Sequence, residues 1–257
     1  MTKTAEEIAV LKEGGAILSR ALSKAMKACV AGATTGELDR IARESMEAEG
    51  ARPSFLGYRI SDEENPFPGT LCISINDEVV HGLPLPDRAI KDGDIVGLDI
   101  GCWYKGLCTD MAATVIVGEV PDKVRALVAD TKEALKAGLS AVKPDGWVSD
   151  VGAAIEDLLK PKKYGIVKDL VGHGVGHAVH EDPQIPHYRE PRAPRTRFRP
   201  GMVVAIEPMV TLGSWRVNQL DDGWTIVTAD GSLAAHFEAT IAIAETGIEL
   251  VTPWPTA

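Results

Sequence analysis

The segments Ile95-Val-Gly-Leu-Asp-Ile-Gly-Cys-Trp-Tyr104 and Cys108-Thr-Asp-Met-Ala-Ala-Thr-Val-Ile-Val117 decide the fold of this chain. Both are rich in apolar and β-branched residues, and the Lys105-Gly pair between them is typical of a hairpin turn. Each segment carries one aspartate, Asp99 and Asp110, eleven positions apart. The pattern predicts an antiparallel hairpin that brings both carboxylates to one end of a sheet.

Two further acidic residues border apolar stretches. Glu207 follows Val203-Val-Ala-Ile206, and Glu238 precedes Ala239-Thr-Ile-Ala-Ile243. A carboxylate in a buried strand costs several kcal/mol unless it is paired or bound to a metal. Each of these carboxylates, taken alone, is also compatible with a strand end that faces water. Asp99, Glu207 and Glu238 together favour a compensating cation.

Composition and charge limit the class of protein. The 257 residues are 45% hydrophobic and 25% charged, which is typical of a soluble globular chain with a sizeable core. The net charge of −10 argues against general binding to DNA. No stretch approaches the roughly 20 apolar residues of a membrane span, and the first residues lack an apolar signal core. We therefore expect a cytoplasmic monomer without membrane or DNA partners.

The four cysteines show no Cys-x-x-Cys spacing. We interpret them as reduced thiols, as expected in the cytoplasm. The alternative is a Cys102–Cys108 bridge across the hairpin.

Hydrophobic periodicity predicts two helices followed by strands, and this order occurs twice. The repeat suggests an internal duplication, approximately 1–119 and 120–257, within a single domain of the α+β class, with antiparallel sheet covered by helices. The predicted helices are Thr4–Cys29, Thr35–Ala48, Val120–Val142 and Val148–Leu159, and the predicted strands beyond the hairpin are Thr70–Ile75, Gly201–Leu212 and Leu233–Ala244.

The segment 186–200 is rich in proline and arginine, which predicts an extended surface loop. One interpretation is a solvated connection between elements. The other is a basic rim that touches an acidic partner such as ribosomal RNA.

A glycine-rich cluster, Gly172-His-Gly-Val-Gly-His-Ala-Val-His180, allows backbone to approach a crowded site closely. Together with Ile206-Glu-Pro-Met209 and Phe237-Glu238, it makes the chain resemble the methionine aminopeptidases of the bacterial type I class, within the pita-bread fold of the M24 metallopeptidases. The other matching segments are Cys72-Ile-Ser-Ile-Asn-Asp-Glu-Val-Val-His-Gly-Leu-Pro84, Gly93-Asp-Ile-Val-Gly-Leu-Asp99, Cys108-Thr-Asp110, His180-Glu-Asp-Pro183 and Gly201-Met-Val-Val-Ala-Ile-Glu-Pro-Met-Val210.

The resemblance implies a site for two divalent metal ions. Asp99 would chelate one ion, Asp110 and Glu238 would bridge the pair, and His173 and Glu207 would complete the other. Four carboxylates carry about −4 and two divalent ions +4, which leaves the pair able to acidify a bridging water. The oxygen-rich ligand set suits Co, Mn, Fe(II) or Zn and does not choose among them.

The activity implied is hydrolysis of the initiator methionine from nascent polypeptides with a small second residue, by attack of a metal-bridging hydroxide. His81 would lie near the leaving nitrogen and His180 near the carbonyl oxygen, and Glu207 would also shuttle a proton. His236 precedes Glu238 by two residues on the same predicted strand, so it should face the same side and either touch substrate or pack on the sheet. His177 and His187 would lie only at the pocket rim.

The resemblance also places a specificity pocket for a flexible thioether side chain. Any of its residues could instead be core. Two departures from the family put the pocket's shape in doubt: the loop 59–68 is longer than usual, and a larger aromatic is common at position 179. Ala239 stands where the family often has another histidine. The candidate pocket residues are Phe55, Tyr58, Cys72, Val179 and Trp224, with His81, His180 and His236 beside them.

Two other functions remain open. An Xaa-Pro peptidase of the same fold shares the five ligands but usually carries an additional N-terminal domain. A non-catalytic peptide- or RNA-binding relative would have lost ligands, and none is lost here. The type II subclass is disfavoured because only 33 residues separate His173 from Glu207, which leaves little room for an inserted subdomain.

Overall fold

The computed structural model describes residues 2–59, 65–192 and 195–256. Its helices are α1 (Ala5–Ala28), α2 (Thr35–Glu47), α3 (Asp122–Ala141), α4 (Ser149–Leu159) and the short 3-10 helix η1 (Lys160–Lys162). Its strands are β1 (Arg52–Pro53), β2 (Leu71–Ile75), β3 (Glu78–Val80), β4 (Ile95–Tyr104), β5 (Leu107–Ile116), β6 (Gly165–Ile166), β7 (Gly172–Gly174), β8 (Glu181–Ile185), β9 (Val203–Ile206), β10 (Met209–Thr211), β11 (Val217–Gln219), β12 (Ile226–Thr228), β13 (Ala234–His236), β14 (Glu238–Ala244) and β15 (Gly247–Leu250).

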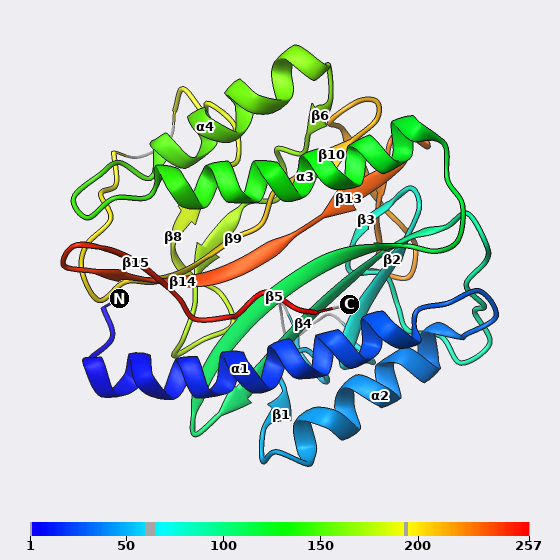
Figure 1. Ribbon diagram of the computed structural model, residues 1–257, viewed down its shortest axis with the longest axis horizontal. Coiled ribbons are helices and arrows are strands. Elements are labelled where there is room, and N and C mark those ends of the chain that lie inside the picture. The colour runs from blue at the N-terminus through cyan, green and yellow to red at the C-terminus, as the bar shows by residue number, and fades with distance from the viewer. Residues whose placement is uncertain (1, 60–64, 193–194, 257) are drawn as a thin grey trace.

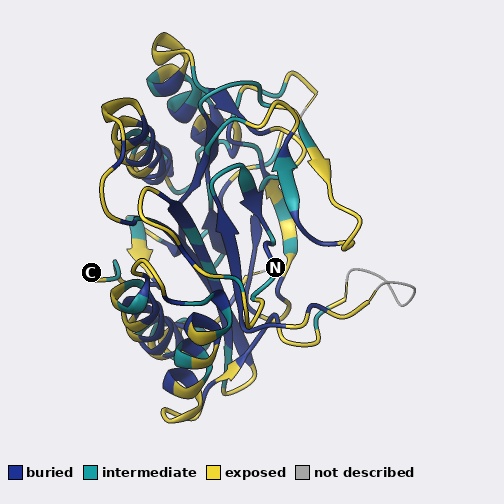
Figure 2. Cartoon of the chain, turned by 90° about the vertical axis from the view of Figure 1, so that its right-hand side faces the viewer, coloured by how far each residue is buried: buried dark blue, intermediate teal, exposed yellow. Residues whose placement is uncertain are grey.

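A nine-stranded sheet forms the centre of the molecule, with strands in the order β1-β4-β5-β14-β9-β7-β8. β2 also pairs with β4, and β15 with β14; every pairing is antiparallel. The four α-helices lie along one side of this sheet, while short strands and loops lie on the other (Figures 1 and 2). The α+β class with antiparallel sheet covered by helices is confirmed.

Helix α1 shows how local sequence determines an element. Thr4 and Glu7 form a reciprocal capping box at its start, which satisfies two backbone donors. Leu11 and Leu18 belong to its buried face. Gly15 also lies on this face, and a Cβ atom there would collide with the carbonyl oxygen of Val251, so the C-terminal segment packs directly against the helix backbone.

The predicted hairpin is confirmed. β4 and β5 pair over their full ten-residue lengths around Lys105-Gly106. The register pairs Cys102 with Thr109 and Cys108 with Trp103, so the two thiols point to opposite faces. A Cys102–Cys108 bridge is therefore excluded, and all four cysteines are free.

The two long C-terminal strands were predicted as continuous, and this is wrong. The first is interrupted after Ile206 and divides into β9 and β10; the second is interrupted at Phe237 and divides into β13 and β14. In both cases the two parts belong to different sheets, because β10 pairs with β13 on one side and with β6 on the other in a separate three-stranded sheet. Pro208 has no N–H to donate, which explains the first interruption.

The order of two helices followed by strands occurs in both halves of the chain. A duplication with a boundary near residue 119, and a single domain over 1–257, remain predictions. No helix among the described residues has the length and apolar character needed to cross a bilayer.

Candidate metal centre

Three adjacent strands of the main sheet form the floor of the site. β4 and β14 each place an acidic residue opposite Ala112 of β5, Asp99 on one side and Glu238 on the other. Asp110 lies two positions along β5, so its side chain points to the same face. The three carboxylates thus surround a small alanine side chain, which leaves space above the sheet.

Two threonine hydroxyls hold the backbone beside this floor. Thr240 Oγ1 accepts from the Asp110 N–H at 3.2 Å and donates to the Asp110 carbonyl at 2.7 Å. Thr114 Oγ1 accepts from the His236 N–H at 2.9 Å and donates to the His236 carbonyl at 2.8 Å. These bonds join β5 to β14 and to β13, which precedes β14 in the chain.

Glu207 and His173 approach the floor from the neighbouring strands. Glu207 is the first residue after β9, and His173 lies in β7 opposite Ala205. The distance from His173 Nε2 to Glu207 Oε1 is 3.4 Å. One ligand atom from each of Asp110, His173 and Glu238 lies within 4.8 Å of the others. The five predicted ligands therefore converge on one face.

The carboxylates lie in an environment that a bound cation would compensate. Burial, with repulsion from Glu207, raises the pKa of Asp99 to about 7 against the attraction of His236. Burial also raises the pKa of Glu207 to about 8. The pKa values of Asp110 and Glu238 lie well above their usual range, first because of burial and then because of neighbouring carboxylates.

Hydrogen bonding gives the same indication. One oxygen each of Asp99, Asp110 and Glu238 is buried without a hydrogen-bond partner among the described residues. Buried unsatisfied oxygens are rare and costly, and four carboxylates this close cannot all stay ionised alone. The donor set therefore fits divalent cations, as predicted.

The imidazole of His173 is already in the form that a metal requires. Its Nδ1 lies 2.8 Å from the carbonyl oxygen of Gly174, which can only accept, so Nδ1 carries the proton. The lone pair of Nε2 then points toward the carboxylates. Burial lowers the pKa of His173 to about 4, which keeps the ring neutral.

His81 and His180 lie above the floor. His81 follows β3 with φ of 60°, an uncommon conformation for a non-glycine residue. Burial lowers its pKa to about 4, helped by His180 and His236. His180 is exposed, and its Nδ1 lies 2.8 Å from Tyr58 Oη. The centroid of its ring lies 4.4 Å from the centroid of the His173 ring. Partial dehydration lowers its pKa as well.

His236 reaches the site for a reason different from the predicted one. It does not share a strand with Glu238, because Phe237 separates β13 from β14. The ring is nevertheless buried beside the floor, with Nε2 3.6 Å from Glu207 Oε2. The argument from strand alternation was wrong, although the proximity that it predicted is found.

A small cavity of about 70 Å³ adjoins the five ligands. Of the predicted pocket residues, Val179 does not line it, although it is buried in the same hydrophobic cluster. Phe67 does line it and was missed; its ring packs edge-on against Trp224 at 5.3 Å. Phe67 lies near the end of the long loop 59–68, whose residues 60–64 lie outside the described part, and loop length alone does not indicate that its ring lines the cavity. Besides the metal ligands, the lining residues are Phe55, Tyr58, Phe67, Cys72, His81, His180 and Trp224.

His177 and His187 were both predicted at the pocket rim, and neither is among the described residues that line the cavity. His177 is exposed and its Nε2 lies 2.7 Å from Glu7 Oε1. His187 is fully buried, and its Nε2 accepts the backbone N–H of Glu207 at 3.1 Å. Burial lowers its pKa to about 3, with His236 and His173 contributing. Segment 186–200 is thus not wholly a surface loop, because His187 and Phe198 are both core residues.

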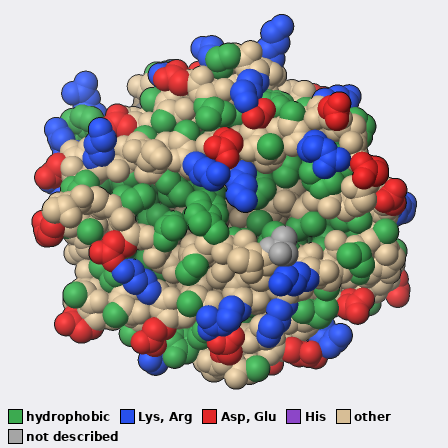
Figure 3. Space-filling model, viewed as in Figure 1, with side chains coloured by type: hydrophobic (Ala, Val, Ile, Leu, Met, Phe, Trp, Pro, Cys, Tyr) green, Lys and Arg blue, Asp and Glu red, His purple; other side chains and the backbone are tan. Residues whose placement is uncertain are grey.

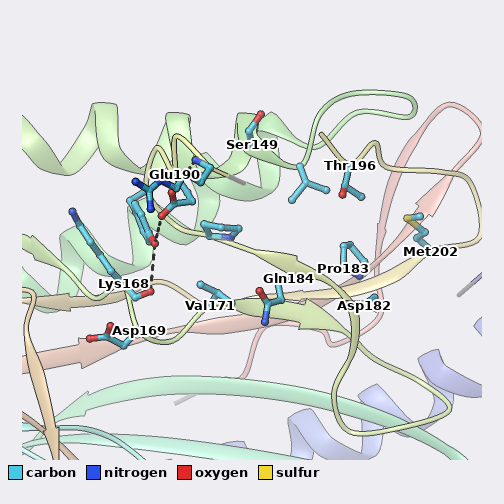
Figure 4. Close-up of a pocket in the computed structure, with 14 residues that line it drawn as sticks. Ser149, Lys168, Asp169, Val171, Asp182, Pro183, Gln184, Glu190, Thr196 and Met202 are labelled. Atoms are coloured by element: carbon cyan, nitrogen blue, oxygen red, sulfur yellow. Dashed lines mark hydrogen bonds between the residues drawn. The ribbon is translucent and has the colours of Figure 1, made fainter. Parts of the chain in front are cut away.

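A larger cavity of about 700 Å³ lies beside strand β8, lined in part by Lys168, Asp182, Gln184 and Glu190 (Figure 4). It contains none of the five converging ligands. Its polar lining groups contact one another: Tyr188 Oη lies 2.8 Å from Glu190 Oε2 and 3.5 Å from the Lys168 carbonyl oxygen, and the Arg192 N–H donates to Glu190 at 2.9 Å. The chemistry is therefore concentrated in the smaller cavity.

Comparison with known proteins agrees with this geometry. Residues 9–245 match the model of metallopeptidase family M24. Methionine aminopeptidase 1 of Bacillus subtilis is 44% identical over 250 residues, covering 97% of this chain and 98% of the relative. Methionine aminopeptidase 2 of Mycobacterium tuberculosis is 40% identical, covering 97% and 85%.

Solved structures show the same relationship. Methionine aminopeptidase from Thermotoga maritima superposes with a TM-score of 0.93 at 41% identity, covering 98% of each chain. Prolidase from Pyrococcus furiosus reaches a TM-score of 0.78 at 25% identity, covering 99% of this chain and 66% of its own. The chain therefore belongs to the methionine aminopeptidases of metallopeptidase family M24.

Proposed function

We propose that this chain hydrolyses the N-terminal methionine from polypeptides whose second residue is small, using two divalent metal ions. The observation that carries the proposal is the convergence of two buried carboxylates, Asp110 and Glu238, two partly buried ones, Asp99 and Glu207, and a neutral imidazole beside a small aromatic cavity. Similarity to methionine aminopeptidases over nearly the whole chain supports the substrate class.

Five residues would hold the ions. Asp99 would bind one ion, Asp110 and Glu238 would lie between the two, and His173 and Glu207 would bind the other. Bound ions would supply Lewis-acid activation of a water molecule and of the scissile carbonyl. The orphaned carboxylate oxygens are the groups that such ions would satisfy.

The protein's own side chains would then manage the proton and the developing charge. Glu207 would take a proton from the attacking water and pass it to the leaving amine. His81 and His180 would donate hydrogen bonds, His81 toward the leaving nitrogen and His180 toward the carbonyl oxygen. The Tyr58 hydroxyl at His180 Nδ1 would hold that ring in place.

The cavity would receive the methionine side chain. Phe55, Phe67 and Trp224 supply aromatic surface, and Cys72 supplies sulfur, which suits an unbranched thioether. Its small volume disfavours bulky aromatic side chains. His236 contacts Glu207 and is not one of the residues that line the cavity. We therefore propose that it contacts the metal-binding residue Glu207 rather than the substrate.

A comparison of three peptides tests this function. Met-Ala-Ser should be cleaved with added Mn(II) or Co(II), whereas Leu-Ala-Ser and Ala-Pro-Ala should be cleaved poorly. Cleavage of Ala-Pro-Ala alone would instead indicate an Xaa-Pro peptidase. No cleavage of any peptide, with no metal bound by elemental analysis, would indicate a non-catalytic binding protein.

Contact of segment 186–200 with the ribosome is a second part of the proposal. Arg189 forms a paired bond with Asp157 at 2.7 Å, and Arg199 bonds Asp145, so those charges are partly neutralised. Arg197 stacks on Trp147 at 3.8 Å. Acidic and basic side chains are interspersed on the face shown in Figure 3. Any docking therefore depends on a few arginines rather than on a broad basic surface.

Co-sedimentation with ribosomes tests this contact. Binding should be salt-sensitive and should weaken when Arg192, Arg195 and Arg197 become alanine. Unchanged co-sedimentation of the triple variant would refute the contact. A cytoplasmic monomer is proposed as well, and cell fractionation with light scattering would check it.

A further inference from the structure

We propose that His187 is a positioning residue for the metal centre: its buried imidazole holds the backbone at Glu207 so that the carboxylate points at the ions. The inference rests on the proposed function in one respect, that Glu207 is a metal ligand. The carrying observation is the 3.1 Å hydrogen bond from the Glu207 N–H to His187 Nε2.

The bond lies where the regular sheet ends. β9 pairs with β7 through His173 opposite Ala205, and the same register would place Glu207 opposite Val171. Val171 lies outside β7, so no ladder carbonyl serves the Glu207 N–H at this point. The His187 side chain supplies the acceptor instead, from the segment that follows β8.

The geometry fixes the tautomer of the imidazole. A backbone N–H can only donate, so His187 Nε2 must hold a lone pair and Nδ1 must carry the proton. That Nδ1 is buried, and no residue in the described part of the chain forms a hydrogen bond with it. A buried donor without a partner is costly. The hydrogen bond that Nε2 accepts from Glu207 is therefore the polar contact that favours the observed position of the ring.

The His187 ring is closely packed at the position where it accepts the Glu207 N–H. A Cβ atom on Gly172 would lie 3.2 Å from His187 Nε2, so the ring rests directly against the glycine backbone. His187 is 0% exposed, and water cannot compete for the bond. Because the peptide plane before Glu207 sets the direction of its Cα–Cβ bond, a lost hydrogen bond would let the carboxylate swing away from the ions.

Three variants separate positioning from folding. His187→Leu removes the acceptor with similar volume, and His187→Gln restores an acceptor at similar reach. Ile185→Val is the matched control, because Ile185 is also fully buried beside Gly172 but does not bond Glu207. Mn(II) affinity is measured by calorimetry on metal-free protein, amide exchange at Glu207 by NMR, and thermal stability in parallel.

His173→Ala should abolish the binding of one Mn(II) ion. We expect His187→Leu to weaken the binding of that same ion by about 10- to 100-fold. Amide exchange at Glu207 should accelerate in the same variant. His187→Gln should recover most of both properties, and Ile185→Val should change stability alone. Equal Mn(II) affinity in His187→Leu and the parent, or no recovery in a folded His187→Gln, would overturn the inference.

A measurement on the unaltered protein remains decisive if the leucine variant does not fold. ¹⁵N NMR of the imidazole should show His187 protonated at Nδ1 and coupled to the Glu207 amide. A proton on Nε2 would refute the acceptor role. If the parent binds no Mn(II) at all, the proposed metal function fails, which is a distinguishable result.

Discussion

The two parts of the sheet that supply acidic ligands are built in different ways. The β4–β5 hairpin is continuous, and Asp99 and Asp110 lie within regular strands. On the other side, Glu207 and Glu238 lie beside interruptions, where β9 gives way to β10 and β13 to β14. Ladder pairing runs along the whole hairpin, with the Thr240 hydroxyl assisting at Asp110, whereas the backbone beside the interruptions is held by the side chains of His187 and Thr114. A single site thus combines a regular half and an individually supported half.

The largest expected effect comes from the regular half. Asp110→Ala removes a carboxylate that would contact both ions, so Mn(II) binding should be lost and cleavage of Met-Ala-Ser should fall at least about a thousandfold. Calorimetry and peptide kinetics measure the two quantities. Retained tight binding of two ions by this variant would mean that the hairpin is not half of the site.

A residue from neither half gives the next effect. His180→Ala should retain both ions, because the ring lies at the cavity mouth, yet should lower kcat about a hundredfold through loss of one donor to the carbonyl oxygen. Metal analysis alongside kinetics distinguishes this variant from the ligand variants. Normal turnover would remove His180 from the mechanism.

The third prediction concerns the link between the halves. Thr114→Val leaves the N–H and carbonyl of His236 without their hydroxyl partner, so unfolding in urea should show a loss of about 2 kcal/mol. Thr131→Val is the control, since its hydroxyl bonds only the Leu127 carbonyl within α3. Equal losses in the two variants would show that the interruption at Phe237 needs no support from β5.

The smallest expected effect is a dependence of the stability of the metal-free protein on pH. The raised pKa values of Asp99, to about 7, and Glu207, to about 8, mean that the folded metal-free protein binds protons that the unfolded chain releases. Their contribution to stability is present at low pH and is lost as the pH rises through these values. His187 and the other buried histidines act in the opposite direction, but only below their ordinary pKa of 6.5.

Between about pH 7 and 9, therefore, the melting temperature of the metal-free protein should fall with rising pH. Added Mn(II) should abolish or reverse this slope, because the ions favour the ionised carboxylates. Scanning calorimetry on both forms gives the comparison. A flat profile for the metal-free protein would show that the carboxylates ionise without penalty.

The same contrast explains what the sequence could predict. The hairpin is a local feature with alternating strands and a turn, so its elements and both aspartates follow from the chain itself. The interruptions depend on which strands pair across the sheet, and no local pattern near Phe237 indicates them. The roles of His81, His173 and His180 came from resemblance rather than from periodicity.

His187 and Phe67 were missed for different physical reasons. His187 lies in a segment whose proline and arginine content indicates exposure, and only the fold reveals that its ring is buried against Gly172. Phe67 follows a long loop, and loop length gives no information on which ring returns to the cavity. Burial of single residues inside irregular segments is a tertiary property, which the chain order does not encode locally.

The packing of α1 against the C-terminal segment has a consequence for biogenesis. Gly15 meets Val251, Ser23 Oγ accepts the Thr256 N–H at 2.9 Å, and Lys12 pairs with Glu249. Helix α1 thus completes its docking only when residues 249–256, more than 200 positions later in the chain, have emerged. We expect a ribosome-bound chain truncated before residue 249 to leave α1 open to proteolysis.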